Sequence, residues 1–334
     1  MIEQIYPHIY SNPIPLPKNP LKALNSYIIV SPERNLIIDT GFNQPECIEA
    51  FFGGVAELGI DLAKTDILLT HRHSDHTGLA SLLEERGAQI YAGAQETVAI
   101  AETSGTEAWV KMERLVTLYG LHEYGITMHD HPGYTYRSPS IAQCIPLAEG
   151  SSLHYGDYEF TVVDIPGHTP GHIGLYEANR RLFFGGDHVL ASITPNITYW
   201  GEEQDSLAQY IASLRKVKAM PIDLLFTAHR DIVRAHAARI DQLLGHHEKR
   251  LAEIIGILRD GAKSVCQVAA EMKWEIRAKS WDDFPKAQKW FASGEAASHL
   301  AYLYNTGHIQ RTIVEGTFRY QLSSPVMEAE QFIK

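Results

Sequence analysis

The chain has few cysteines, no long apolar segment and no excess of positive charge. Because no run of about 18 or more apolar residues occurs, we predict no membrane span. The N-terminal segment lacks a basic stretch followed by an apolar one, so we expect no signal peptide. Cys47, Cys144 and Cys266 lie far apart and form no CxxC pair. This cysteine usage favours reduced thiols and a cytoplasmic location.

The charge balance argues against a general nucleic-acid binder. The sequence contains 29 Lys and Arg against 40 Asp and Glu, which gives a net charge of −11. Residues 240–334 carry 12 basic and 12 acidic side chains, so the whole deficit lies on residues 1–239. Neither part has the strongly basic composition that is typical of proteins that bind a phosphate backbone. A small local basic patch is still compatible with this charge balance.

Apolar segments and turns predict an α/β fold. The segments "NSYIIV" and "NLIIDTG" flank the turn "SPER", which is typical of a β-hairpin. Helix-spaced and strand-like segments then alternate up to about residue 93, and strands resume from "IAQCIPL" to "DLLFTAH". Strand pairs, a helix and further strand pairs indicate sheets covered by outer helices, which is a layered α/β sandwich.

Residues 95–138 interrupt this order. They carry apolar residues at helical spacing, followed by a tyrosine-rich segment that contains glycine. The segment is longer than a connection between two strands needs. We therefore predict a helical cap over an active site, with an additional packed helix pair as the alternative.

The last hundred residues predict a second domain. The segment "RIDQLLGHHEKRLAEIIGILRDG" is a long amphipathic helix, and "SVCQVAAEM" is a short helix with Ser264 as its N-cap. The segment "SGEAASHLAYLYNTG" is a further helix that Gly307 ends, and two alternating strands then surround an "EG" turn. This is the order of a winged helix. We therefore predict domains at 1–235 and 236–334.

One short loop concentrates metal-binding side chains. In "THRHSDH", His71 and His73 are two residues apart, so in an extended loop both can reach the same ion. Asp75 and His76 follow around the turn and can face a second ion. The alternative is a polar turn that is rich in histidine by chance.

Three further candidates make a two-metal site possible. His168 in "PGHTPGH", Asp187 after "RLFFGG" and His229 after "LLFTA" each lie where an apolar strand ends, so they can meet at one edge of the sheets. We assign three ligands to the first ion: His71, His73 and His168. We assign three to the second: Asp75, His76 and His229. Asp187 would bridge both, because a carboxylate has two oxygens.

The ligand types indicate two divalent ions. Imidazole and carboxylate suit zinc, our first choice, and also iron or manganese. Two such ions can hold a hydroxide between them and lower its pKa towards neutrality, so no Ser or Cys nucleophile is needed.

The motifs "THRHSDH", "GHTPGH", "GGDHV" and "TAH" together resemble the metallo-β-lactamase fold superfamily of hydrolases. The ligand set is similar to its glyoxalase II, lactonase and RNase Z-like branches. True β-lactamases of this fold usually have a cysteine in the second site, which this chain lacks. The run "GDHVLASITPNI" and the tail are similar to a LACTB2-like subgroup. The resemblance implies a four-layer αββα sandwich with a C-terminal winged-helix-like domain, and it implies that Asp75 also passes a proton to the leaving group.

One residue departs from the family pattern. Members usually have Gly-His-Gly at the last ligand, whereas this chain has Ala228-His229-Arg230. Arg230 would add a cation beside the metals and favour an anionic substrate group, or it would point to solvent.

Other candidates have both a functional and a packing interpretation. Tentative substrate contacts, with packing as the alternative, are His188, Tyr199 and Trp200. Arg230 is a further tentative substrate contact, with solvent exposure as its alternative. Residues that we expect to be structural, to belong to the cap or to lie on a helix face are His172, His129, His131, His246 and His247.

Three functional hypotheses remain. The first is a dinuclear metal hydrolase, with Asp75 and Asp187 as catalytic residues, that acts on a small ester, thioester or lactone. The second is an RNA-cleaving enzyme of the same fold that uses the winged helix as a platform. The third is a metal-loaded regulatory or ligand-binding protein with little turnover. A homodimer is compatible with all three.

Overall fold

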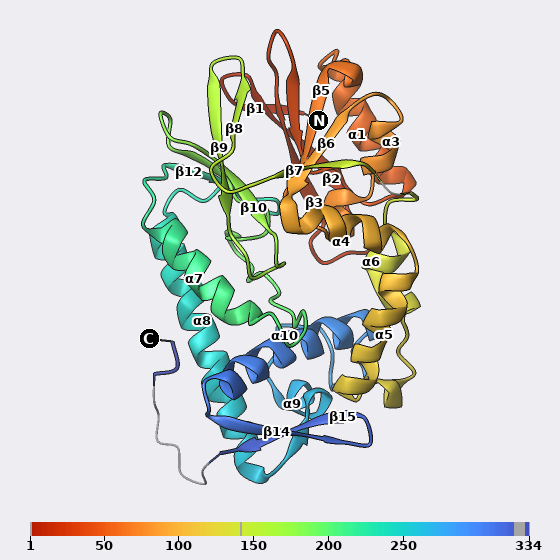
Figure 1. The fold of residues 1–334 in the computed structure, drawn as a ribbon, viewed down its shortest axis with the longest axis vertical. Coiled ribbons are helices and arrows are strands. Elements are labelled where there is room, and N and C mark those ends of the chain that lie inside the picture. Colours follow the sequence, from red (N-terminus) through yellow and green to blue (C-terminus); the bar gives the residue numbers. More distant parts are fainter. Residues whose placement is uncertain (1, 141, 324–330, 334) are drawn as a thin grey trace.

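Two β-sheets stacked face to face form the centre of the N-terminal part (Figure 1). The computed structural model describes residues 2–140, 142–323 and 331–333. In that part of the chain the first sheet has seven strands in sequence order. They are β1 (Glu3–Tyr6), β2 (Ile9–Pro15), β3 (Ala23–Ile29), β4 (Asn35–Ile38), β5 (Thr65–Leu69), β6 (Gln89–Gly93) and β7 (Cys144–Leu147). The predicted hairpin is the antiparallel pair β3 and β4.

The second sheet has five described strands in the order β12-β11-β10-β9-β8. They are β8 (Ser152–Tyr155), β9 (Tyr158–Asp164), β10 (Ile173–Glu177), β11 (Leu182–Phe184) and β12 (Leu224–Phe226). Strands β11 and β12 run parallel, so their carboxyl ends meet at the same edge.

Alternating apolar side chains build the layers, because successive residues of a strand face opposite sides of a sheet. On one side of the first sheet, Ile28 and Ile67 pack with Phe51 of α1 (Pro45–Glu57). The other side of that sheet packs against the second sheet, in a core that includes Ile29, Leu36, Leu68, Phe160 and Phe184. Helix α3 (Ala80–Glu84) shares the outer core with α1, and α7 (Ser206–Lys218) covers the second sheet. The predicted four-layer αββα sandwich is confirmed.

The segment predicted as a cap contacts two different parts of the molecule. It forms α4 (Ala94–Ser104), α5 (Glu107–Tyr119), the short helices η2 (Leu121–Tyr124) and η3 (Met128–Asp130), and α6 (Pro132–Thr135). Helix α5 packs on the C-terminal part, where the Thr117 carbonyl accepts a hydrogen bond from the Thr317 hydroxyl. Helix α6 lies beside the short helix α2 (Ser74–Thr77) of the "THRHSDH" loop. The contacts of α5 therefore favour the alternative of an additional packed helix. A cap over the active site stays a prediction for α6.

The C-terminal part contains the predicted order of helices and strands. It comprises α8 (His236–Ile257), β13 (Lys263–Ser264), α9 (Val265–Glu271), α10 (Lys286–Asn305), β14 (Ile309–Val314) and β15 (Thr317–Leu322). Ser264 caps α9 as predicted, because its side chain accepts a hydrogen bond from the Gln267 amide. Glu315 and Gly316 both have positive φ, as a two-residue hairpin turn requires. The description of this unit as a winged helix stays our interpretation.

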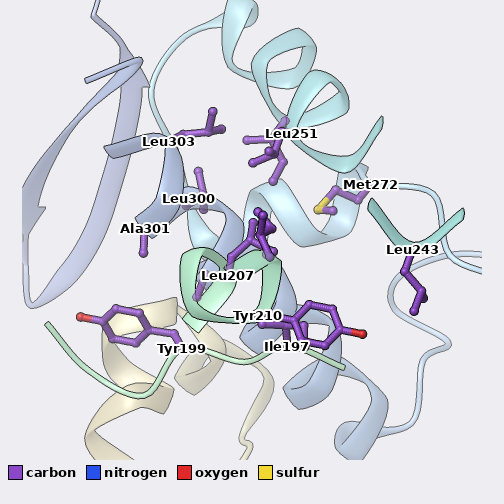
Figure 2. Close-up of a cluster of buried hydrophobic side chains, with 14 of the residues drawn as sticks. Ile197, Tyr199, Leu207, Tyr210, Leu243, Leu251, Met272, Leu300, Ala301 and Leu303 are labelled. Atoms are coloured by element: carbon purple, nitrogen blue, oxygen red, sulfur yellow. The ribbon is translucent and has the colours of Figure 1, made fainter. Parts of the chain in front are cut away.

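Helix α10 is longer than predicted, because it begins at Lys286 instead of Ser293. Its residues are buried on almost every side, so it lacks the contrast between an apolar and a polar face that marks a surface helix. Figure 2 shows part of the cluster around it, which includes Leu207 and Tyr210 of α7 and Leu300 and Leu303 of α10.

One continuous apolar core thus joins the sandwich to the C-terminal part, and the boundary at residue 235 remains a prediction. Within the residues that the structure describes, none of the helices has the length and apolar character to cross a bilayer.

Candidate metal centre

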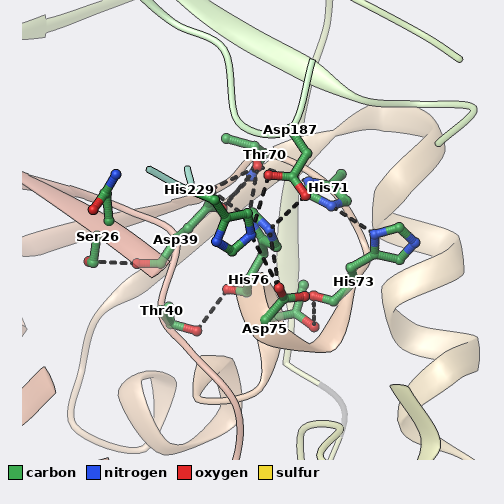
Figure 3. A network of polar contacts seen from close by, with 12 residues as sticks. Ser26, Asp39, Thr40, Thr70, His71, His73, Asp75, His76, Asp187 and His229 are labelled. Carbon is green, nitrogen blue, oxygen red and sulfur yellow. Dashed lines mark hydrogen bonds and ion pairs between the residues drawn. The ribbon is translucent and has the colours of Figure 1, made fainter. Parts of the chain in front are cut away.

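Four loops bring the predicted ligands together at one edge of the two sheets. His71 and His73 follow β5, and His73 is the N-terminal cap position of α2, which carries Asp75 and His76. The other three residues follow β9, β11 and β12: His168, Asp187 and His229. Figure 3 shows His76 surrounded by carboxylates from several of these segments.

Three imidazole nitrogens converge on the first position. The distance from His71 Nε2 to His73 Nδ1 is 3.0 Å, and His168 Nε2 lies 3.2 Å from the former and 2.9 Å from the latter. Donors placed around one tetrahedral zinc ion lie roughly 3.3 Å apart, given zinc–nitrogen bonds of about 2.0–2.1 Å. Hydrogen bonds cannot satisfy all three nitrogens among themselves, so the group fits a shared cation.

A second group of ligand atoms also converges on one point. Ligand atoms of Asp75, His76 and His229 lie within 4.8 Å of one another. The Nε2 atoms of His76 and His229 are buried and have no hydrogen-bond partner. Unpaired buried polar atoms are costly, and a metal ion would satisfy both. The donors therefore fit the second ion that the sequence predicted.

Asp187 lies between the two positions. Its Oδ2 is 3.6 Å from His168 Nε2 and 3.7 Å from His76 Nε2, whereas its Oδ1 is 3.4 Å from His229 Nε2. One carboxylate therefore faces one ligand of the first group and two ligands of the second. This position suits a bridging ligand.

Hydrogen bonds to the opposite ring nitrogen orient three of the imidazoles. His76 Nδ1 lies 2.8 Å from Asp39 Oδ2, His168 Nδ1 lies 2.8 Å from the Asn196 carbonyl, and His229 Nδ1 lies 2.7 Å from the Ala23 carbonyl. Because a carbonyl only accepts, the proton of His168 and of His229 sits on Nδ1. Each Nε2 lone pair is then free for a metal.

The electrostatics agree with the assignment. Burial, with the neighbouring imidazoles, holds the pKa values of His71 and His73 well below their usual range, so both rings are neutral and can bind a cation. Burial also acts on His76, but the carboxylates of Asp39, Asp75 and Asp187 outweigh it and raise the pKa of His76 well above its usual value. Metal binding at the second position must therefore displace a proton.

Sequence reasoning missed two residues that support the loops. Asp39 also accepts hydrogen bonds from the backbone amide and the hydroxyl of Thr70, the residue before the first ligand. Glu96 is fully buried and binds the Arg72 guanidinium, the Thr169 hydroxyl and the Gly171 amide. It thereby joins the loop of His71 to the loop of His168. The "DTG" that directly follows β4 was a signal for Asp39, whereas a single acid in a helix offered none for Glu96.

Two further histidines lie behind the ligands. His172 is fully buried, and its ring centroid is 4.7 Å from that of His71. His188 is also fully buried, and its Nε2 lies 2.9 Å from the Ser213 hydroxyl of α7. Burial lowers the pKa of His188 to about 3, so the ring is neutral. This placement favours the packing alternative for His188 over substrate contact.

Trp200 lines a cavity beside the first position. The cavity has a volume of about 740 Å³, and its wall includes Arg72, Val98 and Pro170. The Trp200 ring centroid lies 6.1 Å from that of His73, and the indole NH donates to the His168 carbonyl. In contrast, the Tyr199 side chain is only 5% exposed and donates to Glu202. The placement favours substrate contact for Trp200 more than for Tyr199.

The Arg230 side chain contacts the N-terminal part of the chain. Its guanidinium donates to the Pro20 carbonyl at 2.8 Å, and its backbone has a φ of 69°. A left-handed backbone is the conformation that glycine adopts without strain. This hydrogen bond argues against a side chain that is free in solvent, and a contact between Arg230 and an anionic substrate group stays a prediction.

The remaining histidines lie outside the ligand groups. His131 packs against Trp109, Trp290 and Phe291, and burial lowers its pKa to about 4. His129 contacts the Tyr134 ring. On α8, the His247 ring is fully buried and its Nδ1 lies 3.0 Å from His299 Nε2.

Comparisons with known proteins agree with this geometry. Residues 21–229 match the family model described as the metallo-beta-lactamase superfamily. A hydroxyacylglutathione hydrolase of Cereibacter sphaeroides is 28% identical over 52% of this chain and 51% of its own length. A beta-lactamase-like protein 2 homolog of Drosophila melanogaster is 26% identical over 70% and 68%. The human acyl-coenzyme A thioesterase MBLAC2 is 25% identical over 49% and 58%.

A solved structure extends the likeness to the C-terminal part. The crystal structure of a metallo-beta-lactamase family protein from Thermus thermophilus has a TM-score of 0.81 and 25% identity, covering 96% of this chain and all of that chain. The alignment with the hydroxyacylglutathione hydrolase spans about half the length of that enzyme. The matched residues include every predicted ligand, and the resemblance seen in the sequence is confirmed. The chain belongs to the metallo-beta-lactamase superfamily.

Proposed function

We propose that the chain is a dinuclear metal-dependent hydrolase that cleaves a small ester, thioester or lactone, with thioesters as the first choice. The observation that carries this proposal is the position of Asp187 between two groups of buried ligand atoms. Zinc is the first candidate for both positions, because nitrogen and carboxylate donors suit it.

Each residue of the centre has a distinct part in this proposal. His71, His73 and His168 would hold one ion, and Asp75, His76 and His229 the other, with Asp187 between them. When bound, such a pair supplies a Lewis acid and a water molecule of lowered pKa. Asp75 Oδ2 lies 3.4 Å from His229 Nε2, so this carboxylate is at the centre and is our candidate for carrying a proton to the leaving group.

The surroundings favour an uncharged reacting group. The Arg72 guanidinium, which lines the cavity at Trp200, is paired with buried Glu96 and is therefore not an unpaired cation for an anion. Glu102 and Glu203 line the cavity at Trp200 and would repel phosphate groups, whereas Glu202, which also lines it, is paired with Arg311. The acyl-coenzyme A thioesterase among the relatives supports cleavage of a thioester bond, whereas the carboxylates at the cavity disfavour a carrier with phosphate groups such as coenzyme A. A small, neutral acyl thioester fits these features best.

A panel of metal-loaded assays tests the proposal. We expect turnover of thioesters, with slower cleavage of simple esters and lactones and little cleavage of phosphodiesters. The same panel with Asp187→Asn controls for contaminating hydrolases. Faster cleavage of a phosphodiester would favour the RNA-cleaving alternative, and silence across the panel with metals bound would favour a regulatory protein.

The RNA-cleaving alternative has less support at the C-terminal hairpin. Its strands expose Ile313 and Val314, and its turn carries acidic Glu315. Arg311 is paired with Glu202. A hairpin of this composition does not present the basic surface that phosphate binding needs.

A further inference from the structure

Helix α10 of the C-terminal part packs directly on the segment that follows Asp187. A Cβ atom added to Gly294 would lie 2.3 Å from Thr198 Oγ1, so the helix and this segment approach each other closely at Gly294. One turn further on, the Ser298 hydroxyl donates to the Ile197 carbonyl. The segment around Ile197 is therefore fixed by the helix, although the two are about a hundred residues apart in the sequence.

Asn196 connects this contact to the metal ligands. Its side-chain Nδ2 donates to the Phe291 carbonyl at 3.2 Å and to Glu295 Oε2 at 3.3 Å, both on α10. Its backbone carbonyl accepts the hydrogen bond from His168 Nδ1 at 2.8 Å. A single residue thus contacts the C-terminal helix through its side chain and a ligand imidazole through its backbone.

Glu295 is itself held by charged neighbours. The carboxylate belongs to a residue only 7% exposed, and its Oε1 lies 3.5 Å from Arg250 Nε and 3.8 Å from His246 Nε2 of α8. Arg250 also donates to the Lys273 carbonyl and lies over the Trp274 ring. A buried charge with several partners has few alternative positions, so Glu295 gives Asn196 a fixed anchor.

We propose that Asn196 and Glu295 are positioning residues for the first metal, and that α10 thereby sets the orientation and tautomer of His168. The proposal rests on the metal centre of the proposed function. The Asn196 carbonyl keeps the proton of His168 on Nδ1, which leaves the Nε2 lone pair directed at His71 and His73. Loss of such an outer partner typically lowers metal affinity by about 10- to 100-fold.

The test compares Asn196→Ala with a matched control, Asn12→Ala. Asn12 is a buried amide that likewise donates to helix carbonyls, but these are the carbonyls of Ala50 and Phe51 on α1 and not on α10. Zinc titration against a competing chelator gives the affinities of the two ions separately. We expect Asn196→Ala to weaken one ion by about 10- to 100-fold and leave the other unchanged, whereas Asn12→Ala weakens neither.

Nitrogen NMR of the metal-free protein gives a second readout. It reports which ring nitrogen of His168 carries the proton, and we expect Nδ1 in the wild type and in Asn12→Ala, but a mixture in Asn196→Ala. Glu295→Gln keeps an oxygen acceptor for Asn196 and should retain more affinity than Glu295→Ala. If Asn196→Ala binds both ions like the wild type and keeps the Nδ1 proton, the proposal is wrong.

Failure of the proposed function has a different signature. If the wild-type protein binds fewer than two ions, the proposed function as a dinuclear hydrolase is wrong. The NMR comparison would still decide whether α10 sets the tautomer of His168. The two proposals can therefore fail separately.

Discussion

Replacement of Asp39 by asparagine changes how the second ion is held and leaves its ligands in place. In the wild type, Asp39 Oδ2 accepts the proton of His76 Nδ1 at 2.8 Å, and Asp39 also accepts from the Thr70 amide and hydroxyl. Asparagine can keep one oxygen towards Thr70, but its NH₂ group would then face His76. The imidazole would move its proton to Nε2, the atom that should bind the metal. The side chain keeps its size, so the loop need not move.

The expected loss is about 10- to 100-fold in affinity for the second ion, which corresponds to about 1.4–2.7 kcal/mol. The assay is metal content per chain after equilibration at a buffered free zinc concentration, with Asp66→Asn as the control. Asp66 is likewise a buried aspartate, and it binds Arg34 and the Tyr155 hydroxyl instead of a ligand. Equal loss of both ions in Asp39→Asn, or no loss beyond that of Asp66→Asn, would refute the tautomer argument.

Three further perturbations separate catalysis, metal binding and folding. Asp187→Asn removes the charge between the two ligand groups, so turnover should fall by more than about 100-fold, since a ligand matters more than its outer partner; unchanged turnover in steady-state assays would contradict its role. Lower pH should remove metal, because protons compete for His76 and His229, whose pKa values the carboxylates raise against the effect of burial; metal analysis across pH checks this, and loading independent of pH would count against it. Ser264→Ala removes the cap of α9 and should cost about 1 kcal/mol in urea unfolding, with zinc content unchanged; a loss of zinc would show that the cap has a wider role.

The seven candidate ligands could be located in the sequence because histidine and aspartate stand where apolar strands end, and the structure brings them together. The layers could be predicted for a similar reason, since alternation along the strands marks two buried faces. The residues that orient the candidate ligands have weaker signals in the sequence. Asp39 and Glu96 are single acids whose partners lie on other segments. Asn196 acts on His168 through its backbone carbonyl, and any residue type has one.

Helix α10 shows where periodicity fails. Its buried positions include Ala296, Ser298 and His299, so polar and apolar residues occur on all sides. A helix enclosed by protein does not need one apolar face, and the start at Lys286 could not be located from the pattern. The substrate contacts were also beyond the sequence, because exposure and partners separate Trp200 from Tyr199, and both depend on tertiary packing.

The number of metal ions bound per chain tests the central claim most directly. The protein should be purified without chelator, equilibrated with zinc and analysed for metal and protein in the same sample. The account predicts two ions per chain in the wild type, one ion when His168→Ala disrupts the first group, and one ion when His229→Ala disrupts the second. Fewer than one ion per wild-type chain, or two ions retained in both variants, would contradict it.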